Sequence, residues 1–297
     1  MRARGWKRNL SGYLFVSPWL LGFIIFTAGP IIASFGLSFT FFDMISAPRW
    51  VGLRNFQRLF FDDPLFFVSL YNTLYYVAFS VPFGLAIALL MALMLNGSLR
   101  GMAAYRTVFY LPVAVPAVAG SILWIWILNP EFGLLNNALG LIGLDGLAWL
   151  GSPVWSKPGM IVMSLWGIGG AMVVFLAGLQ AVPAHLYEAA MIDGAGPWQK
   201  FRNVTLPMLS PTVFFNLIIG GIGAFQVFTA AYVMTGGGPV NSTLFYILYL
   251  YQTAWTNFRM GYAAAMAWIL FCVVVVVTLI QFGLAKRWVY YEGEQGR

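Results

Sequence analysis

The side chains best suited to bind a solute are amides and hydroxyls set within long apolar runs. Asn72, Gln180, Asn216, Gln226 and Thr229 stand among aliphatic and aromatic residues, with glycines close by. Neutral polar groups and small residues within apolar helices either tighten helix packing or line a polar cavity. Packing alone would explain most of this pattern. The same set would also serve an uncharged, hydroxyl-rich solute, with aromatic faces for ring stacking.

Residue types that form catalytic or metal sites are scarce. No lysine follows a glycine, so the phosphate-binding GxxxxGK[ST] loop is absent, and the glycine-rich turn 236–239 is interpreted as a backbone turn. The one histidine, His185, has no Cys or His neighbour for a metal site, and the one cysteine, Cys272, lies in an apolar run. The sequence therefore predicts a non-catalytic chain with no metal site and no cofactor of its own.

The elements that carry these residues follow from composition. The chain has 297 residues, of which 61% are hydrophobic and 8% charged, whereas about 25% of the residues in a soluble domain are charged. So few charges cannot cover a soluble fold of this size. The net charge of +7 falls between apolar runs and forms no basic patch, which argues against a nucleic-acid partner. We expect an all-α, polytopic membrane protein in contact with lipid.

Six charge-free runs are long enough to cross the hydrocarbon core as helices of roughly 20 residues. The first run follows basic residues, as in a signal peptide, but it far exceeds the ~7–15 apolar residues of such a peptide, so we expect an uncleaved helix. The expected spans lie near residues 13–42, 66–95, 107–128, 158–182, 212–234 and 260–284. They make one transmembrane domain, 13–284, between an N-terminal segment, 1–12, and a tail, 285–297.

Lysine and arginine are distributed unequally between the two sides of these spans. Eleven lie on the side of the termini, from Arg2 to Arg297, and five, including Lys157, lie on the other. Because cytoplasmic loops are enriched in Lys and Arg, we expect both termini in the cytoplasm. A seventh span through 243–257 would break this pattern and would be short. No Asp, Glu, Lys, Arg or His falls inside the expected spans, which argues against an ion-coupled pump.

The segment between the fourth and fifth expected spans, 183–211, has the features of a docking loop. Pro183 can open a short helix with small alanines on one face, Gly194 can end it, and Pro197 can begin a second helix. Leu206-Pro207 would close the loop. The pattern predicts two short helices at the membrane surface, where a partner protein can approach closely.

This loop resembles the EAA loop of binding-protein-dependent ABC importer permeases. The matching residues are Glu188, Ala189, Ala190, Asp193, Gly194, Leu206 and Pro207. Val204 stands where the family often has isoleucine, an exchange that leaves docking intact. Further motifs, at 51–56, 129–136, 175–180, 232–243 and 257–263, are similar to the carbohydrate-uptake subgroup that includes the maltose and glycerol-3-phosphate permeases. Together they cover nearly the whole chain.

The resemblance implies a type I ABC importer fold and a permease subunit for a mono-, di- or oligosaccharide in the bacterial cytoplasmic membrane. Its implied partners are a second, homologous permease, two ATP-binding cassette subunits that use ATP and Mg, and an extracytoplasmic solute-binding protein. The EAA-loop residues would couple to the ATPase. In related permeases the sugar lies midway across the membrane, and the matching positions are Trp166, Gly167, Gly170, Phe225, Gln226 and Thr229.

Two alternatives stay open at the level of sequence. The same assembly could import glycerol 3-phosphate or another polyol or sugar phosphate, although no Arg or Lys within the spans would bind the anion. A stand-alone channel or facilitator would instead pass solute without ATP or partners. The sequence does not identify the sugar, because selectivity is shared with the binding protein and the second permease.

Overall fold

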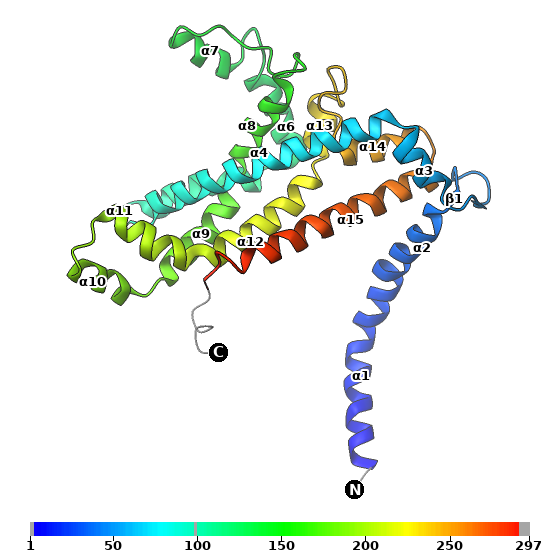
Figure 1. The fold of residues 1–297 in the computed structure, drawn as a ribbon, viewed down its shortest axis with the longest axis horizontal. Coiled ribbons are helices and arrows are strands. Elements are labelled where there is room, and N and C mark those ends of the chain that lie inside the picture. Colours follow the sequence, from blue (N-terminus) through cyan, green and yellow to red (C-terminus); the bar gives the residue numbers. More distant parts are fainter. Residues whose placement is uncertain (1–2, 98–99, 291–297) are drawn as a thin grey trace. The chain divides into compact units, whose positions relative to one another are not determined.

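The computed structural model describes residues 3–97 and 100–290, with side chains from residue 12 onward, so Arg2, Arg297 and the tail beyond residue 290 lie outside it. Most of the described chain is helical, with loops and turns between the helices (Figure 1). The strands of the described residues form one short antiparallel pair, β1 (Thr40–Phe41) and β2 (Arg49–Trp50). The predicted all-α class is confirmed.

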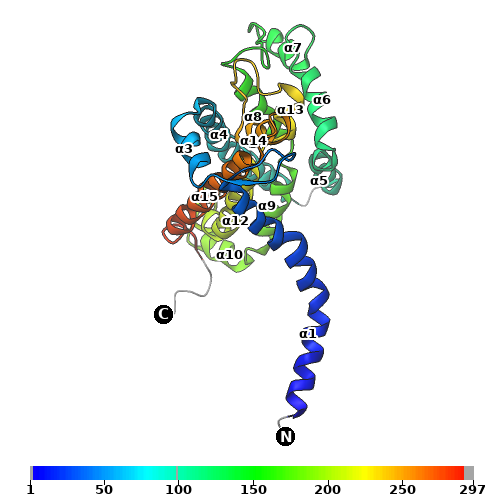
Figure 2. The ribbon, with the colours of Figure 1, turned by 90° about the vertical axis from the view of Figure 1, so that its right-hand side faces the viewer.

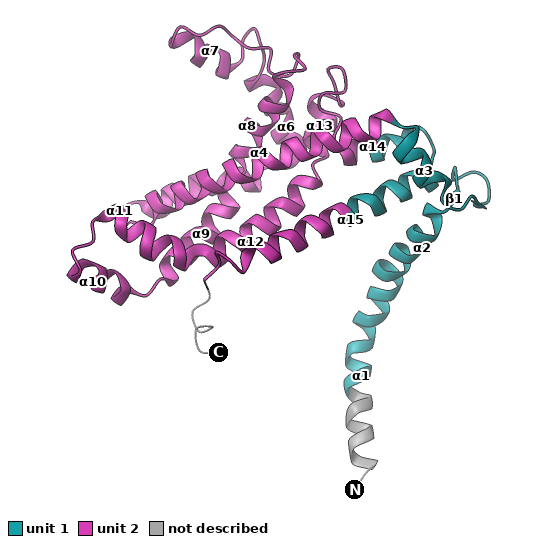
Figure 3. Ribbon diagram, viewed as in Figure 1, with its two compact units in different colours: residues 1–63, 250–272 teal, residues 64–249, 273–297 magenta. Residues whose placement is uncertain are grey.

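The chain divides into two compact units, which Figure 3 shows in separate colours. Unit 1 comprises Met1–Asp63 and Leu250–Cys272, and unit 2 comprises Pro64–Tyr249 and Val273–Arg297. The helices of unit 1 are α1 (Ala3–Phe23), the π-helical turn η1 (Ile24–Ala28), α2 (Gly29–Ser38), α3 (Arg54–Phe61), the π-helical turn η4 (Gln252–Thr256) and the first half of α15 (Met260–Ala285).

Unit 1 is held together by contacts of α15 with α2 and with the segment around β1. Gly261 approaches the carbonyl of Thr40 so closely that a side chain at this position would collide with it. The Gly261 backbone N–H also donates to the Phe42 carbonyl, 3.2 Å away, and Trp268 Nε1 donates to Ser34 Oγ at 3.2 Å. The close approach explains why a glycine stands at the first turn of α15.

Unit 2 contains the helices that surround the candidate sites. These are α4 (Pro64–Leu95), α5 (Met102–Tyr110), the 3-10 turn η2 (Leu111–Ala114), α6 (Ala117–Ile127), α7 (Leu134–Leu141), α8 (Ser156–Trp166), α9 (Gly169–Ala181), α10 (Ala184–Ile192), α11 (Pro197–Lys200), the π-helical turn η3 (Phe201–Thr205), α12 (Leu206–Phe225), α13 (Thr229–Met234), most of α14 (Tyr246–Tyr251) and the second half of α15. Within this unit α7 and α10 lie at opposite ends (Figures 1 and 2).

The core of unit 2 forms where α4 packs against α9 and α12. Ala88 and Ala92 present small side chains on one face of α4, and Met172, Phe175 and Leu209 fill the space opposite them. Residues four apart lie on the same face of a helix, so the alanine pair lets the neighbouring helices approach closely. This packing holds α4, α9 and α12 in place, and these helices position the candidate cavity and the short helix α10.

By length and composition, four described helical runs could cross a membrane, and the number rises to six if two bent pairs are each one span. The four runs are Gly12–Ser38, Pro64–Leu95, Pro197–Met234 and Met260–Ala285. The bent pairs are Met102–Ala114 with Ala117–Ile127, at 101°, and Ser156–Trp166 with Gly169–Ala181, at 49°. Pro112 and Pro116 explain the sharper bend, since proline lacks an N–H and restricts the preceding residue. The helix expected over 107–128 is therefore broken.

The helical run that corresponds to the fifth expected span, 212–234, begins earlier, at Pro197. Pro197 has the favoured first position of α11, and the chain continues through η3 into α12 without a break. Leu206-Pro207 thus begins α12 and does not close a loop, because the wider hydrogen-bond spacing of the π-helical turn accommodates the proline. The segment 243–257 holds α14 and η4, and neither belongs to a described run long enough for a seventh span.

A pair of glycines in α9 tests the close packing of α9 on α12. A Cβ at Gly178 would lie 2.8 Å from Thr212 Oγ1 and 2.9 Å from Leu209 Cδ2, whereas none of the described heavy atoms would lie within 4 Å of a Cβ at Gly170. Overpacking costs roughly 1–3 kcal/mol, and alanine exceeds glycine as a helix former by about 1 kcal/mol. We expect Gly178→Ala to lower the melting temperature by a few degrees and Gly170→Ala to keep or raise it. Thermal unfolding in detergent measures both, and equal melting temperatures would contradict the packing.

Candidate functional site

The first candidate site is α10 and the turn that follows it. Pro183 caps the helix in an extended conformation, as the sequence predicted. Gly194 has φ +76°, a left-handed conformation that suits glycine, and the Ala195 N–H donates to the Ala190 carbonyl at 2.8 Å. The Pro183 cap and the glycine turn together fix the length of α10.

The surface of α10 is exposed and partly apolar. Glu188 and Ala189 are exposed, and the Glu188 carboxylate makes no hydrogen bond or ion pair with any described residue. Ile192 is 87% exposed, and Trp198 of α11 is 68% exposed. Neighbouring large apolar side chains left open to the surroundings usually mark an interaction surface. Asp193 is exposed at the C-cap of the same helix.

Two contacts tie α10 to the long helices. The Tyr187 hydroxyl and Thr205 Oγ1 are 3.0 Å apart and join α10 to the turn before α12. The helix α9 ends immediately before α10 and packs on α12 through Gly178. A displacement of α10 would therefore be transmitted to both α9 and α12.

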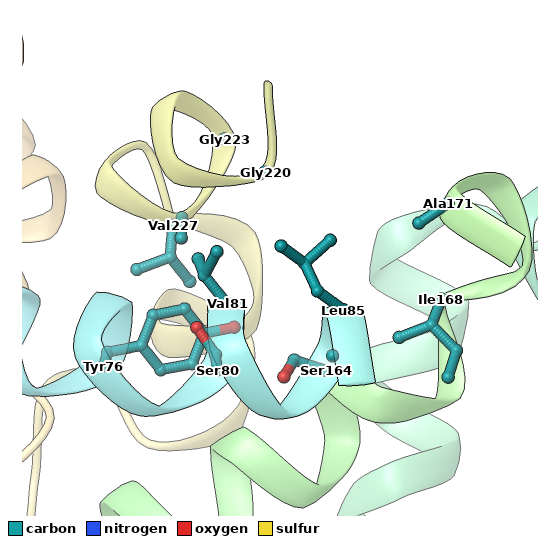
Figure 4. Close-up of a pocket in the computed structure, with 12 residues that line it drawn as sticks. Tyr76, Ser80, Val81, Leu85, Ser164, Ile168, Ala171, Gly220, Gly223 and Val227 are labelled. Carbon is teal, nitrogen blue, oxygen red and sulfur yellow. The ribbon is translucent and has the colours of Figure 1, made fainter. Parts of the chain in front are cut away.

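The second candidate site is a cavity of about 280 Å³ between α4, α8, α9 and α12 (Figure 4). Tyr76 and Ser80 line it from α4, Ser164 from α8, and Gly220 and Gly223 from α12. A second cavity, of about 200 Å³, shares Tyr76 and Ser164 with the first. Ligand cavities typically measure roughly 300–1,000 Å³, so the pair suits a small solute or one residue of a longer one.

The Ser80 hydroxyl is the polar group in the first cavity that lacks a partner among the described residues. Ser80 is 8% exposed, and a buried hydroxyl without a hydrogen bond costs roughly 1–3 kcal/mol. The Ser164 hydroxyl, by contrast, donates to the Ile161 carbonyl at 2.6 Å. No Asp, Glu, Lys, Arg or His is among the described residues that line either cavity. The site can therefore hydrogen-bond a solute hydroxyl but supplies no charge of its own.

Of the six residues predicted to bind the sugar, two line a cavity and four do not line either of the two cavities. Trp166 and Gly167 line the second cavity. The others line neither of these two cavities: Gly170 lies in the first turn of α9, Phe225 is buried in packing, Gln226 is exposed at the end of α12, and Thr229 begins α13.

Sequence reasoning did not single out Tyr76, Ser80 or Ser164. The signal that could have found two of them is the spacing on α4, where Tyr76, Ser80 and Gly84 follow one another at intervals of four residues and share one face of an otherwise apolar helix. All three line the first cavity.

The segment that follows the glycine-rich turn, residues 241–246, is tied to α4 and α8. Asn72 Nδ2 donates to the carbonyls of Asn241 and Leu244, at 2.8 and 3.2 Å. The Tyr246 N–H donates to Thr73 Oγ1 at 2.8 Å. The hydroxyls of Ser156 and Ser242 are 2.8 Å apart. This segment thus closes the end of unit 2 that lies one helical turn beyond the cavities.

Long apolar helices, an uncharged hydroxyl-lined cavity and an exposed surface helix define the membrane-spanning part of a transporter. The family model described as "Binding-protein-dependent transport system inner membrane component" matches residues 80–290. The chain belongs to this family, which confirms the resemblance found in the sequence.

Named relatives extend the similarity over nearly the full chain. The probable ABC transporter permease protein YesP of Bacillus subtilis is 43% identical over 97% of this chain and 94% of its own. The lactose transport system permease protein LacF of Rhizobium radiobacter is 36% identical over 94% and 95%. A chain in the crystal structure of a bacterial alginate ABC transporter, in complex with alginate pentasaccharide-bound periplasmic protein, is 28% identical with a TM-score of 0.82, covering 96% of each chain.

Two serines of α4 provide a test of the unpaired Ser80 hydroxyl. Ser69 is fully buried and donates to the Phe66 carbonyl at 2.8 Å, whereas Ser80 has no partner among the described groups. We expect Ser69→Ala to cost about 1 kcal/mol, a few degrees of melting temperature, and Ser80→Ala to cost nothing or to stabilise the empty protein. Thermal unfolding without solute compares the two variants. A larger loss for Ser80→Ala would show that its hydroxyl is bonded within the fold.

Proposed function

We propose that this chain is the permease subunit of an ATP-driven importer that takes up a sugar delivered by an extracytoplasmic binding protein. The family is a component of binding-protein-dependent transport, and two relatives are named for lactose and alginate transport. The solved alginate transporter holds a periplasmic protein loaded with an alginate pentasaccharide. These relatives support a saccharide as the solute.

The observation that carries the sugar assignment is the unpaired Ser80 hydroxyl in a cavity without charged residues. A solute hydroxyl bound there would give this buried group its missing partner and recover the cost of leaving it unpaired. Tyr76 and Trp166 offer aromatic surface in the two cavities, and aromatic rings pack well against the apolar face of a sugar ring. Both features suit a polyhydroxylated ring.

The energy for uptake would come from outside this chain. Two partner ATPase subunits would bind ATP and Mg, and a second permease would complete the membrane pathway. Glu188, Ala189, Ala190 and Gly194 would meet the ATPase on α10, and Asp193 would lie at its edge. A difference of about 5.5 kcal/mol in affinity for two conformations is enough to invert a 1:99 equilibrium. The exposed surface of α10 and its ties to α9 and α12 support this route.

We infer a bacterial cytoplasmic membrane location with α10 and both termini in the cytoplasm. Cytoplasmic segments are enriched in Lys and Arg, and the predicted inner side carries eleven of the 16. The opposite positions of α7 and α10 within unit 2 support their placement on opposite sides of the membrane (Figure 2). With α10 in the cytoplasm, α7 and its neighbouring loops would lie on the outer side, where an extracytoplasmic binding protein would deliver the solute.

Two alanines of α10 test the coupling role. Ala189 and Ala184 are both exposed, but at 3.6 residues per turn they point in directions about 140° apart. We expect Ala189→Phe to abolish sugar uptake, because a bulky ring on the docking face keeps the ATPase away, while Ala184→Phe retains it. Uptake into membrane vesicles, with immunoblots showing equal amounts of each variant in the membrane, gives the comparison. Normal uptake with Ala189→Phe would rule out docking through this face.

A further inference from the structure

Lys157 in the first turn of α8 occupies an unusual environment. Its Nζ donates to Asn72 Oδ1 at 3.0 Å and lies over the rings of Tyr71 and Tyr75, 5.4 and 5.3 Å from their centroids. Cations within about 6 Å of an aromatic face are attracted to it. The ammonium is thereby held in one place, between α8 and α4.

The charge of Lys157 is not compensated within the described part of the chain. None of the described carboxylates forms an ion pair with it, and Asn72 is the acceptor of its described hydrogen bond. An ammonium can donate three hydrogen bonds. The side chain is half-buried, and the helix N-terminus beside it adds further positive potential. Lys157 therefore offers an anion a fixed, partly desolvated charge with donors to spare.

Lys157 lies one helical turn from the cavities of the proposed sugar site. Met160, three residues further along α8, lines the second cavity, and Ser164 lines both. On α4, Asn72 precedes Tyr76 by four residues, which is about 6 Å of helix. The Lys157–Asn72 hydrogen bond thus joins the two helices just beyond the cavity wall. Lys157 itself lines neither cavity, so a solute would reach the ammonium by extending from the cavities past Met160 and Tyr76.

We propose that Lys157 binds the carboxylate of an acidic sugar, so that the solute is a saccharide containing a uronic acid. This inference rests on the proposed function, since it assigns a substrate class to the same site. Asn72 and Ser80 are eight residues, about 12 Å, apart on α4, so Lys157 and Ser80 would meet different rings of an oligosaccharide. One ring would give Ser80 its missing hydrogen bond, and the carboxylate of a neighbouring ring would give Lys157 its missing counter-charge. Both unsatisfied groups of this region are then matched by one molecule.

A carboxylate fits this position better than a phosphate does. A phosphate monoester carries a charge of roughly −1.5 to −2 and is usually bound by several donors, often arginines. Lys157 is a single cation, and no other Lys or Arg in the described chain contacts its cage of Tyr71, Asn72 and Tyr75. One ammonium matches the single charge of a uronate.

The test compares three 1,4-linked disaccharides that differ only at C6, built from galacturonate, from galactose and from galactose 6-phosphate, and each is named below by its unit. Equilibrium binding of each labelled sugar is measured on the full chain in its assembled transporter, for the wild type, Lys157→Met and Lys157→Arg. A charge-assisted hydrogen bond in a partly buried site corresponds to about tenfold in affinity. We expect the wild type to bind galacturonate about tenfold more tightly than galactose, Lys157→Met to remove this preference, and Lys157→Arg to keep most of it.

Galactose binding separates recognition from folding, because Lys157→Met should bind it as the wild type does. An equal loss for galactose and galacturonate would overturn the proposal and leave Lys157 as a link between α4 and α8. A preference for galactose 6-phosphate over galacturonate would overturn it in favour of a sugar phosphate. If the wild type binds neither galactose nor galacturonate, the uronate proposal is overturned, whereas the sugar importer itself is contradicted only if a panel of other neutral oligosaccharides also fails to bind.

Discussion

The structure depends on the absence of Asp, Glu, Lys, Arg and His from the middle of its described apolar helices. Within the described runs that could cross a membrane, such groups are confined to the first two turns, as with Arg106, Lys157, Lys200 and Arg202. A charge in the centre of a bilayer costs about 2.5–3.5 kcal/mol on insertion scales, so these helices are compatible with lipid. Ion- and proton-coupled transporters usually carry ionisable groups inside the membrane. The proposed function therefore takes the energy for uptake from a partner, with α10 as the proposed docking surface.

The contacts between the described helices are made mainly by apolar and neutral polar groups. Close approaches at Gly178 and Gly261 let helices pack with little side-chain volume between them. Hydroxyls and amides donate to backbone carbonyls, as Asn72 Nδ2 does to those of Asn241 and Leu244. The Ser80 hydroxyl is one of three buried side-chain groups without a described partner, together with Trp124 Nε1 and Thr253 Oγ1. Lys157, on the helix that packs against α4, forms no described ion pair. Unsatisfied groups of this kind are where a solute gains most from binding.

The sequence predicted the helical class, the order of the apolar runs and the short helix α10, because these depend on local composition and on Pro183 and Gly194. It misplaced helix ends where two local signals compete. Pro112 and Pro116 break an apolar run, and the proline at 207, which usually ends a helix, stands at the start of one after a π-helical turn.

The cavity could not be predicted in the same way. Its walls come from α4, α8, α9 and α12, and Lys157 and Asn72 meet across 85 residues of sequence. One chain without an alignment carries no signal for such long-range contacts. Two of the residues predicted from the family resemblance, Trp166 and Gly167, line the second cavity. The unpaired Ser80 hydroxyl was found only from the packed structure.

The most direct test of the account is solute flux through vesicles that contain this chain with and without its partners. With the partner ATPases, the second permease and the loaded binding protein, labelled oligosaccharide should accumulate only when ATP is present. Vesicles that contain the chain alone should remain closed to the sugar. Downhill flux through the chain alone, independent of ATP, would identify a facilitator and contradict the account.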